Sequence, residues 1–184
     1  MKKNVKNFQI MLSAMIIMTV IAMPLSLNGQ GGKANFAGTW AFNAEKSDMG
    51  GAPGGQGGAP QGGRMGGFGG GDFTAAQESN LLTVTRTRTN QSGESVTTVS
   101  KYTLDGKESV NTTGRGDSKS VATWSADGKT LKIATTSTFD MGGETRTMTS
   151  TQEWTLTDAG ILSVKSTSST PNGERVTIAV YNKK

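Results

Sequence analysis

The sequence contains no cysteine and no histidine. The absence of cysteine excludes disulfides and thiolate nucleophiles, and the absence of both excludes zinc sites built from them. Histidine is also the side chain that titrates unaided near neutral pH, so the usual general base is missing. No pair of carboxylates forms an evident acid–base couple. We therefore expect a protein that is not an enzyme, with no catalytic residue, no metal and no cofactor.

The chain also lacks a large net charge of either sign. The formal net charge is +5, but Lys2, Lys3 and Lys6 stand in the first six residues and leave +2 for the rest of the chain. A nucleic-acid binder carries a clustered basic face. We therefore expect no nucleic-acid partner.

The N-terminus has a short hydrophobic run, from Ile10 to Ala22, which follows these lysines and precedes Pro24. The run is shorter than the roughly 20 residues that a membrane-spanning helix needs. This layout predicts a secretory signal peptide at 1–30, and hence an exported protein, periplasmic or secreted, with no stable membrane anchor after cleavage. A short membrane anchor is the alternative.

Residues 50–71 are dominated by glycine and cannot bury enough apolar surface to offset the entropy of ordering them. We interpret this tract as a flexible insertion within a single domain, 31–184. It lacks the residue order of a phosphate-binding loop, so nucleotide binding is not expected.

The rest of the chain alternates valine, threonine and serine between turn signals such as Asp105-Gly106 and Asn172-Gly173. We see no helix of normal length after the N-terminal segment. The pattern predicts an all-β, antiparallel up-and-down meander of about ten strands closed into a barrel. The predicted strands are 36–43, 73–78, 81–90, 95–104, 108–112, 118–125, 130–139, 144–157, 161–169 and 174–182.

Polarity changes along the inward face of these strands. Apolar residues begin strands 81–90, 130–139 and 161–169, and they end strands 95–104, 118–125 and 144–157. Because neighbouring strands run in opposite directions, these apolar ends should gather into one closed core. The other end should be wet and open, because burying unpaired arginines there would be costly. The last strand should bring Val176, Ile178 and Val180 near the closed end, where pairing with the first strand would remove both sheet edges.

The first strand carries Gly38-Thr39-Trp40, which resembles the Gly-x-Trp signature of lipocalins. In that family the tryptophan plugs the closed end, often under an arginine from a late strand. Arg175 is the late-strand candidate here, although it begins its strand nearer the open end. The longer string 36–47 is similar to the start of small exported bacterial proteins that open with Gly-Thr-Trp-x-x-Asn-x-x-Lys-Ser. The resemblance implies a lipocalin-like fold and leaves the role unassigned.

The open end supplies a candidate binding site. Its cationic members suit recognition of an anion, because arginine binds carboxylates with paired hydrogen bonds. The alternatives are that the arginines are solvated rim charges or point outward, and that the apolar members, like Trp124 and Tyr102, only pack the core. The predicted ligand-binding residues are Arg86, Arg88, Arg146, Phe139, Met148 and Ser150.

The sequence thus favours an exported protein that binds a small amphipathic or anionic molecule at the polar end of its barrel. The alternative is a structural or interaction protein of the cell envelope with a filled barrel. The oligomeric state is left open.

Overall fold

The computed structural model describes residues 32–50, 70–89, 92–113, 116–141, 143–158, 160–170 and 173–184. The predicted signal peptide, and the predicted insertion apart from Gly50, Gly70 and Gly71, lie outside these residues. The described chain forms ten antiparallel strands, and the ends of most of them differ from the predictions by no more than about two residues. They are β1 (Gly38–Asp48), β2 (Phe73–Glu78), β3 (Leu81–Thr89), β4 (Ser95–Thr103), β5 (Glu108–Thr113), β6 (Gly116–Trp124), β7 (Thr130–Met141), β8 (Glu144–Asp158), β9 (Ile161–Thr170) and β10 (Gly173–Lys183).

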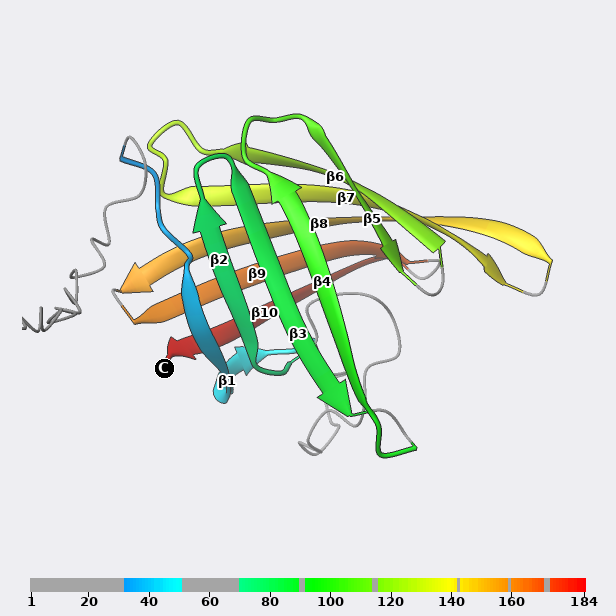
Figure 1. Cartoon of the computed structure of the whole chain (residues 1–184), viewed down its shortest axis with the longest axis horizontal. Coiled ribbons are helices and arrows are strands. Elements are labelled where there is room, and N and C mark those ends of the chain that lie inside the picture. Colours follow the sequence, from blue (N-terminus) through cyan, green and yellow to red (C-terminus); the bar gives the residue numbers. More distant parts are fainter. Residues whose placement is uncertain are drawn as a thin grey trace, which may run out of the picture.

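All ten strands belong to one up-and-down sheet, which curls into a nearly closed barrel (Figure 1). The strand order is β4-β3-β2-β1-β10-β9-β8-β7-β6-β5. The predicted pairing of the first and last strands is confirmed, with Trp40 opposite Lys183 and Phe42 opposite Tyr181. No helix in the described part of the chain is long and apolar enough to span a bilayer. The fold is therefore the all-β meander that the sequence predicts.

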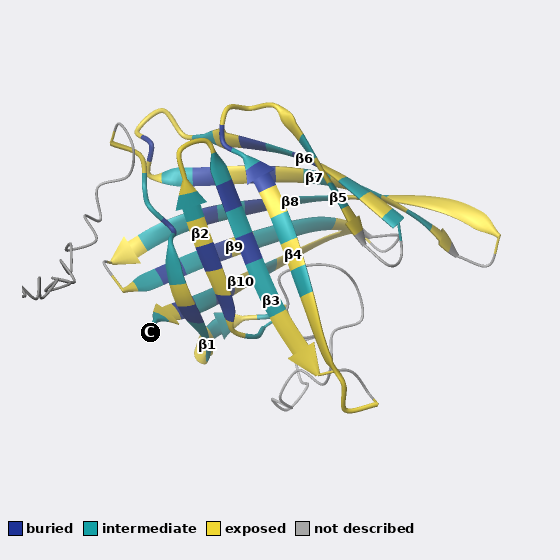
Figure 2. Cartoon of the chain, in the orientation of Figure 1, coloured by how far each residue is buried: buried dark blue, intermediate teal, exposed yellow. Residues whose placement is uncertain are grey.

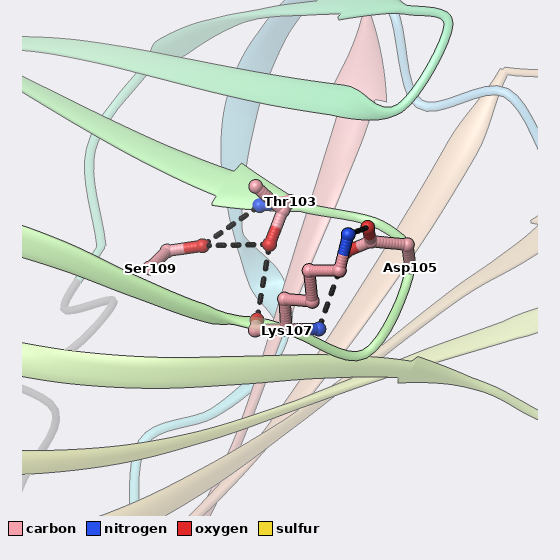
Figure 3. A network of polar contacts seen from close by, with 4 residues as sticks. All are labelled: Thr103, Asp105, Lys107 and Ser109. Carbon is pink, nitrogen blue, oxygen red and sulfur yellow. Dashed lines mark hydrogen bonds and ion pairs between the residues drawn. The ribbon is translucent and has the colours of Figure 1, made fainter.

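The barrel nevertheless keeps two edges, at β4 and β5, because these consecutive strands form no backbone ladder. The expectation that closure would remove every edge is wrong. Side chains bridge the seam between them: the Lys101 N–H donates to Asn111 Oδ1 over 2.7 Å, and Asn111 Nδ2 donates to the Lys101 carbonyl over 3.0 Å. Nearer the turn, the Thr103 N–H donates to Ser109 Oγ, and Thr103 Oγ1 donates to the Lys107 carbonyl (Figure 3). These polar side chains satisfy backbone groups that a neighbouring strand would otherwise satisfy.

Buried side chains gather toward one end of the strands, away from the exposed ends of β3, β4, β7 and β8 (Figure 2). Leu82, Leu104, Leu131 and Trp154 belong to one hydrophobic cluster, and Trp124 packs against it. The predicted gathering of the apolar strand ends is therefore confirmed. The rings of Phe36, Phe73 and Tyr181 fill the same cluster.

The inward face of β10 differs from the prediction. Tyr181 pairs with Leu162 and Ala179 pairs with Val164, and all four side chains are buried. Val176 and Ile178, which were predicted to lie near the closed end with Val180, are instead 44% and 38% exposed. Residues directly opposite each other in a ladder share a face, so the buried β9 residues determine which β10 residues point inward.

The segment before β1 closes the base of the barrel. Phe36 has no exposed surface, stacks on Trp124 at 5.9 Å between ring centroids and meets Trp154 edge-on at 5.6 Å. The Gln77 amide holds the segment on both sides: Oε1 accepts from the Phe36 N–H, and Nε2 donates to the Ala34 carbonyl. One side chain of β2 thus satisfies two backbone groups that the sheet does not reach.

Replacing Gln77 by methionine should therefore destabilise the protein. The side chain keeps its approximate size and loses both hydrogen bonds, which we expect to lower the free energy of unfolding by about 1–3 kcal/mol. Urea denaturation measures the loss, with the exposed neighbour Glu78→Ala as the control, expected within about 0.5 kcal/mol of the parent. Equal stability of Gln77→Met and the parent would show that the amide does not hold the base closed.

A late-strand cation does lie over Trp40, but it is Lys183 and not Arg175. Lys183 Nζ is 5.6 Å from the centroid of the Trp40 ring, and Arg175 Nη2 donates to the Met49 carbonyl. Arg175, which begins its strand nearer the open end, is therefore not the cation that covers Trp40. A Cβ at Gly38 would come within 2.6 Å of Lys183 Cε, and the φ of Gly38 is +144°. The Gly-x-Trp pattern thus has a local reason, because the positive φ at this position favours glycine.

Candidate functional site

Arg86 is a cation on the inward face of the barrel, next to the core. On β3 it follows the buried Leu82 and Val84 on the same face of the strand, so it stands directly above the apolar core. Its guanidinium carbon lies 4.7 Å from the centroid of the Phe73 ring, a distance typical of a cation–π contact. Burial lowers the pKa of Arg86, and the nearby hydroxyls of Tyr181 and Tyr102 oppose that shift. The site therefore begins with a positive charge held on an aromatic surface and shielded from water.

Two buried tyrosines accompany this arginine. Tyr181 has no exposed surface and packs edge-on against Phe73 at 4.9 Å, while Tyr102 is 8% exposed. Burial raises the pKa of both phenols, so both stay protonated at neutral pH and can donate a hydrogen bond. Arg86 attracts the Tyr181 hydroxyl and opposes the rise in its pKa, but the two groups do not meet in full hydrogen-bond geometry. Among the described residues, this hydroxyl has no hydrogen-bond partner.

Small hydroxyl side chains line the inner face of β6, β7, β8 and β9. In the ladder Ser120 stands opposite Thr135, Thr135 opposite Ser150, and Ser150 opposite Ser168. Ser120 is 2% exposed, and its Oγ lies 2.9 Å from Thr135 Oγ1. We call this surface the hydroxyl wall, and it consists of Ser118, Ser120, Thr135, Ser137, Ser150, Ser166 and Ser168.

Gln152 joins the hydroxyl wall to the core. Its side chain is nearly buried, and its Oε1 accepts a hydrogen bond of 3.2 Å from Trp154 Nε1. Trp154 in turn contacts the ring of Phe73, on which Arg86 lies. The interior therefore passes from tightly packed rings at the base to arginine, tyrosine, amide and hydroxyl groups above them.

The six residues predicted to bind a ligand fall into two groups. Arg86 and Arg88 share the inward face of β3, but Arg86 is half-buried and Arg88 is exposed nearer the strand end. The other four residues alternate along one face of the β7–β8 hairpin. Arg146 and Phe139 are paired there, Met148 pairs with Ser137, and Ser150 lies in the hydroxyl wall.

The cationic members differ in their surroundings. The Arg146 side chain is 56% exposed and forms an ion pair of 3.5 Å with Glu144. It therefore has the surroundings of a solvated rim charge, which was one of the alternatives. Trp124 packs against the core cluster, which matches the core-packing alternative for it. Tyr102 belongs to the cluster as well, but it also lies close enough to Arg86 to act on its charge. Sequence reasoning missed Tyr181 and Phe73, and the pairing of Tyr181 with the apolar β9 residue Leu162 is the signal that identifies it.

A shallow hollow of about 380 Å³ lies on the outer side of β6, β7 and β8. An exposed ion pair, Lys119 with Glu108 at 3.2 Å, flanks it. In the described residues no cluster of three or more histidine, cysteine, aspartate or glutamate side chains could hold a metal ion. The convergence of buried polar groups lies inside the barrel, so the interior is the candidate site.

The sequence matches no protein-family model and no curated protein sequence. A solved structure that resembles this chain is the zebrafish ileal bile acid-binding protein complexed with cholic acid. The two chains are 16% identical, and the match covers 81% of this chain and 98% of the other with a TM-score of 0.48.

Proposed function

We propose that this protein is an exported binding protein that holds a small organic anion inside its barrel, with Arg86 as the anchor of the negative group. The observation that carries the proposal is the position of the Arg86 guanidinium, which faces inward above the core and lies on the ring of Phe73. A charge in such surroundings binds an anion more strongly than the same charge in water, because the local dielectric constant is lower.

The chemistry of the neighbours supports an anion as the ligand. Arg86 remains a cation at neutral pH, because the pKa of an arginine lies far above that pH. Burial lowers the pKa of Arg86, and two nearby tyrosine hydroxyls counteract the shift. The hydroxyls of Tyr102 and Tyr181 stay protonated because burial raises the pKa of each phenol. A carboxylate at this point would therefore meet one charged donor and two neutral donors.

The protein acts, in this proposal, by binding and not by catalysis. The sequence has neither histidine nor cysteine, and the aspartates Asp105 and Asp127 support turn backbones, accepting from the Lys107 and Lys129 N–H groups respectively. Export is part of the same proposal. It is supported by the lysines and the short apolar run at the N-terminus.

Isothermal titration calorimetry tests the function. The titrants are three carboxylates that differ in the group attached to the carboxylate: dodecanoate, benzoate and gluconate. We expect at least one to bind, and we expect Arg86→Met to weaken that binding about tenfold to a hundredfold, because a hydrogen bond to a charged group is lost. Lys101→Met removes an equal charge from the exposed surface of the adjacent strand β4 and should leave the affinity unchanged.

Two results would reject the proposal. The first is that none of the three carboxylates binds the parent protein. The second is that a bound carboxylate keeps its affinity in Arg86→Met, which would place the anion elsewhere. Circular dichroism of each variant establishes that the sheet is retained.

A further inference from the structure

We propose that the ligand is a hydrophilic, polyhydroxylated carboxylate and that the hydroxyl wall recognises its hydroxyl groups. This inference rests on the anion-binding function proposed above and narrows it to one class of ligand. It excludes fatty acids and other anions with a hydrocarbon body.

The first support is the composition of the wall that lies above the core. A row of residues that are paired directly across β6, β7, β8 and β9 consists of serine and threonine alone: Ser120, Thr135, Ser150 and Ser168. Each hydroxyl has one donor hydrogen and two acceptor lone pairs. A hydrocarbon placed against this wall would remove water from these groups and return no hydrogen bond. A polyhydroxylated molecule replaces the lost water with hydrogen bonds of the same kind.

The second support is that the apolar interior is already occupied by the protein itself. Leu82, Leu131, Leu162 and Val164 have no exposed surface, and Trp40 and Trp154 are fully buried among them. The apolar side chains of the base are therefore in contact with one another. An acyl chain would have to lie along hydroxyls next to the core, because the first inward positions after the core are serine or threonine on β6, β7 and β9, and Ser150 follows Gln152 on β8. The apolar Met148 and Phe139 lie farther out on the same face.

The third support is the Tyr181 hydroxyl, which is independent of the wall. Its residue has no exposed surface, and among the described residues the oxygen lacks a hydrogen-bond partner. Leaving a buried hydroxyl unbonded is unfavourable, and groups of this kind call for a functional explanation. It lies beside Arg86, so a carboxylate anchored there would reach a donor on the floor of the site while its body extends along the hydroxyl wall.

Gluconate and hexanoate test the inference directly, because both are linear carboxylates of equal chain length and only gluconate carries hydroxyls. Isothermal titration should show gluconate binding at least about tenfold more tightly than hexanoate. Ser150→Ala removes one wall hydroxyl and should weaken gluconate about threefold to tenfold. Thr149→Val, at the adjacent exposed position of β8, removes a hydroxyl from the outer face and should change nothing.

The outcomes separate this inference from the function on which it rests. Binding of hexanoate as tight as that of gluconate, with both weakened in Arg86→Met, would overturn the hydroxyl recognition and leave anion binding standing. Equal gluconate affinity in the parent, Ser150→Ala and a second wall variant, Thr135→Val, would also overturn it. Failure of gluconate, hexanoate, dodecanoate and benzoate alike would overturn both proposals.

Discussion

Replacing Trp154 by alanine should lower the free energy of unfolding by about 3–5 kcal/mol, the range for truncating a large aromatic side chain in a core. Trp154 has no exposed surface, and the rings of Phe36 and Phe73 each lie 5.6 Å from it. It therefore links the N-terminal segment to the ring on which Arg86 lies. The truncation also removes the indole N–H that donates to Gln152. Urea denaturation followed by circular dichroism measures the loss.

Trp124→Ala is the matched control for this prediction. Trp124 also contacts Phe36, but it is only partly buried at the margin of the cluster. We expect a clearly smaller loss of stability, because folding removes less apolar surface from water at Trp124 than at Trp154. Equal losses for the two variants, or a loss below about 1 kcal/mol for Trp154→Ala, would contradict the placement of the core around Trp154.

The strands could be predicted from the sequence because a period of two and the turn residues act locally. The span of β2 follows directly from the alternation of Phe73, Ala75 and Gln77, and the structure has the same bounds. The seam between β4 and β5 could not be predicted in this way. Asp105-Gly106 is as good a turn signal as the others, but the next ladder does not form. Leu104 points into the core, and its N–H donates to the Asn80 carbonyl on the β2–β3 turn.

The inward face of β10 illustrates a second limit of sequence reasoning. Val176 and Ile178 favour strand structure on either face, so their apolar character does not decide which face is buried. The decision comes from β9, whose buried Leu162 faces Tyr181 across the ladder. A pairing of this kind is non-local, and only knowledge of the register reveals it. Tyr181, the tyrosine that says most about the candidate site, is therefore the one that the alternation of apolar residues in β10 does not identify.

The distance of a residue from the core along its strand is a third property that periodicity does not predict. Arg86 and Arg88 have the same parity and so the same predicted face. In the structure the first lies over Phe73, whereas the second is exposed where β3 extends beyond the core. Arg146 is exposed for a similar reason, on the long strand β8. The distance of each arginine from the core along its strand therefore decides which of them is shielded from water.

The free energy of unfolding should fall steeply as the pH rises above 10, because Tyr102 and Tyr181 are buried as neutral phenols. Burial raises the pKa of both above their ordinary value of 10.0 in the folded state. Below that value neither state ionises, and the stabilisation is complete. Above it the unfolded chain loses protons that the folded chain keeps, and stability is lost until the pH passes the folded pKa. The loss should approach about 1.4 kcal/mol per pH unit for each tyrosine.

Urea unfolding at pH 8 and pH 11 measures this effect, and the variants Tyr102→Phe and Tyr181→Phe assign it. Each variant has no phenol to ionise at its position, so each should lose less stability between the two pH values than the parent protein. Any other effect of pH on stability is common to all three proteins, and the comparison removes it. Arg86 attracts a nearby phenolate and should make the effect of Tyr181 smaller than burial alone would produce. Parallel losses in the parent and both variants would mean that these hydroxyls are hydrated in the folded barrel, and the floor of the proposed anion site would then be wet.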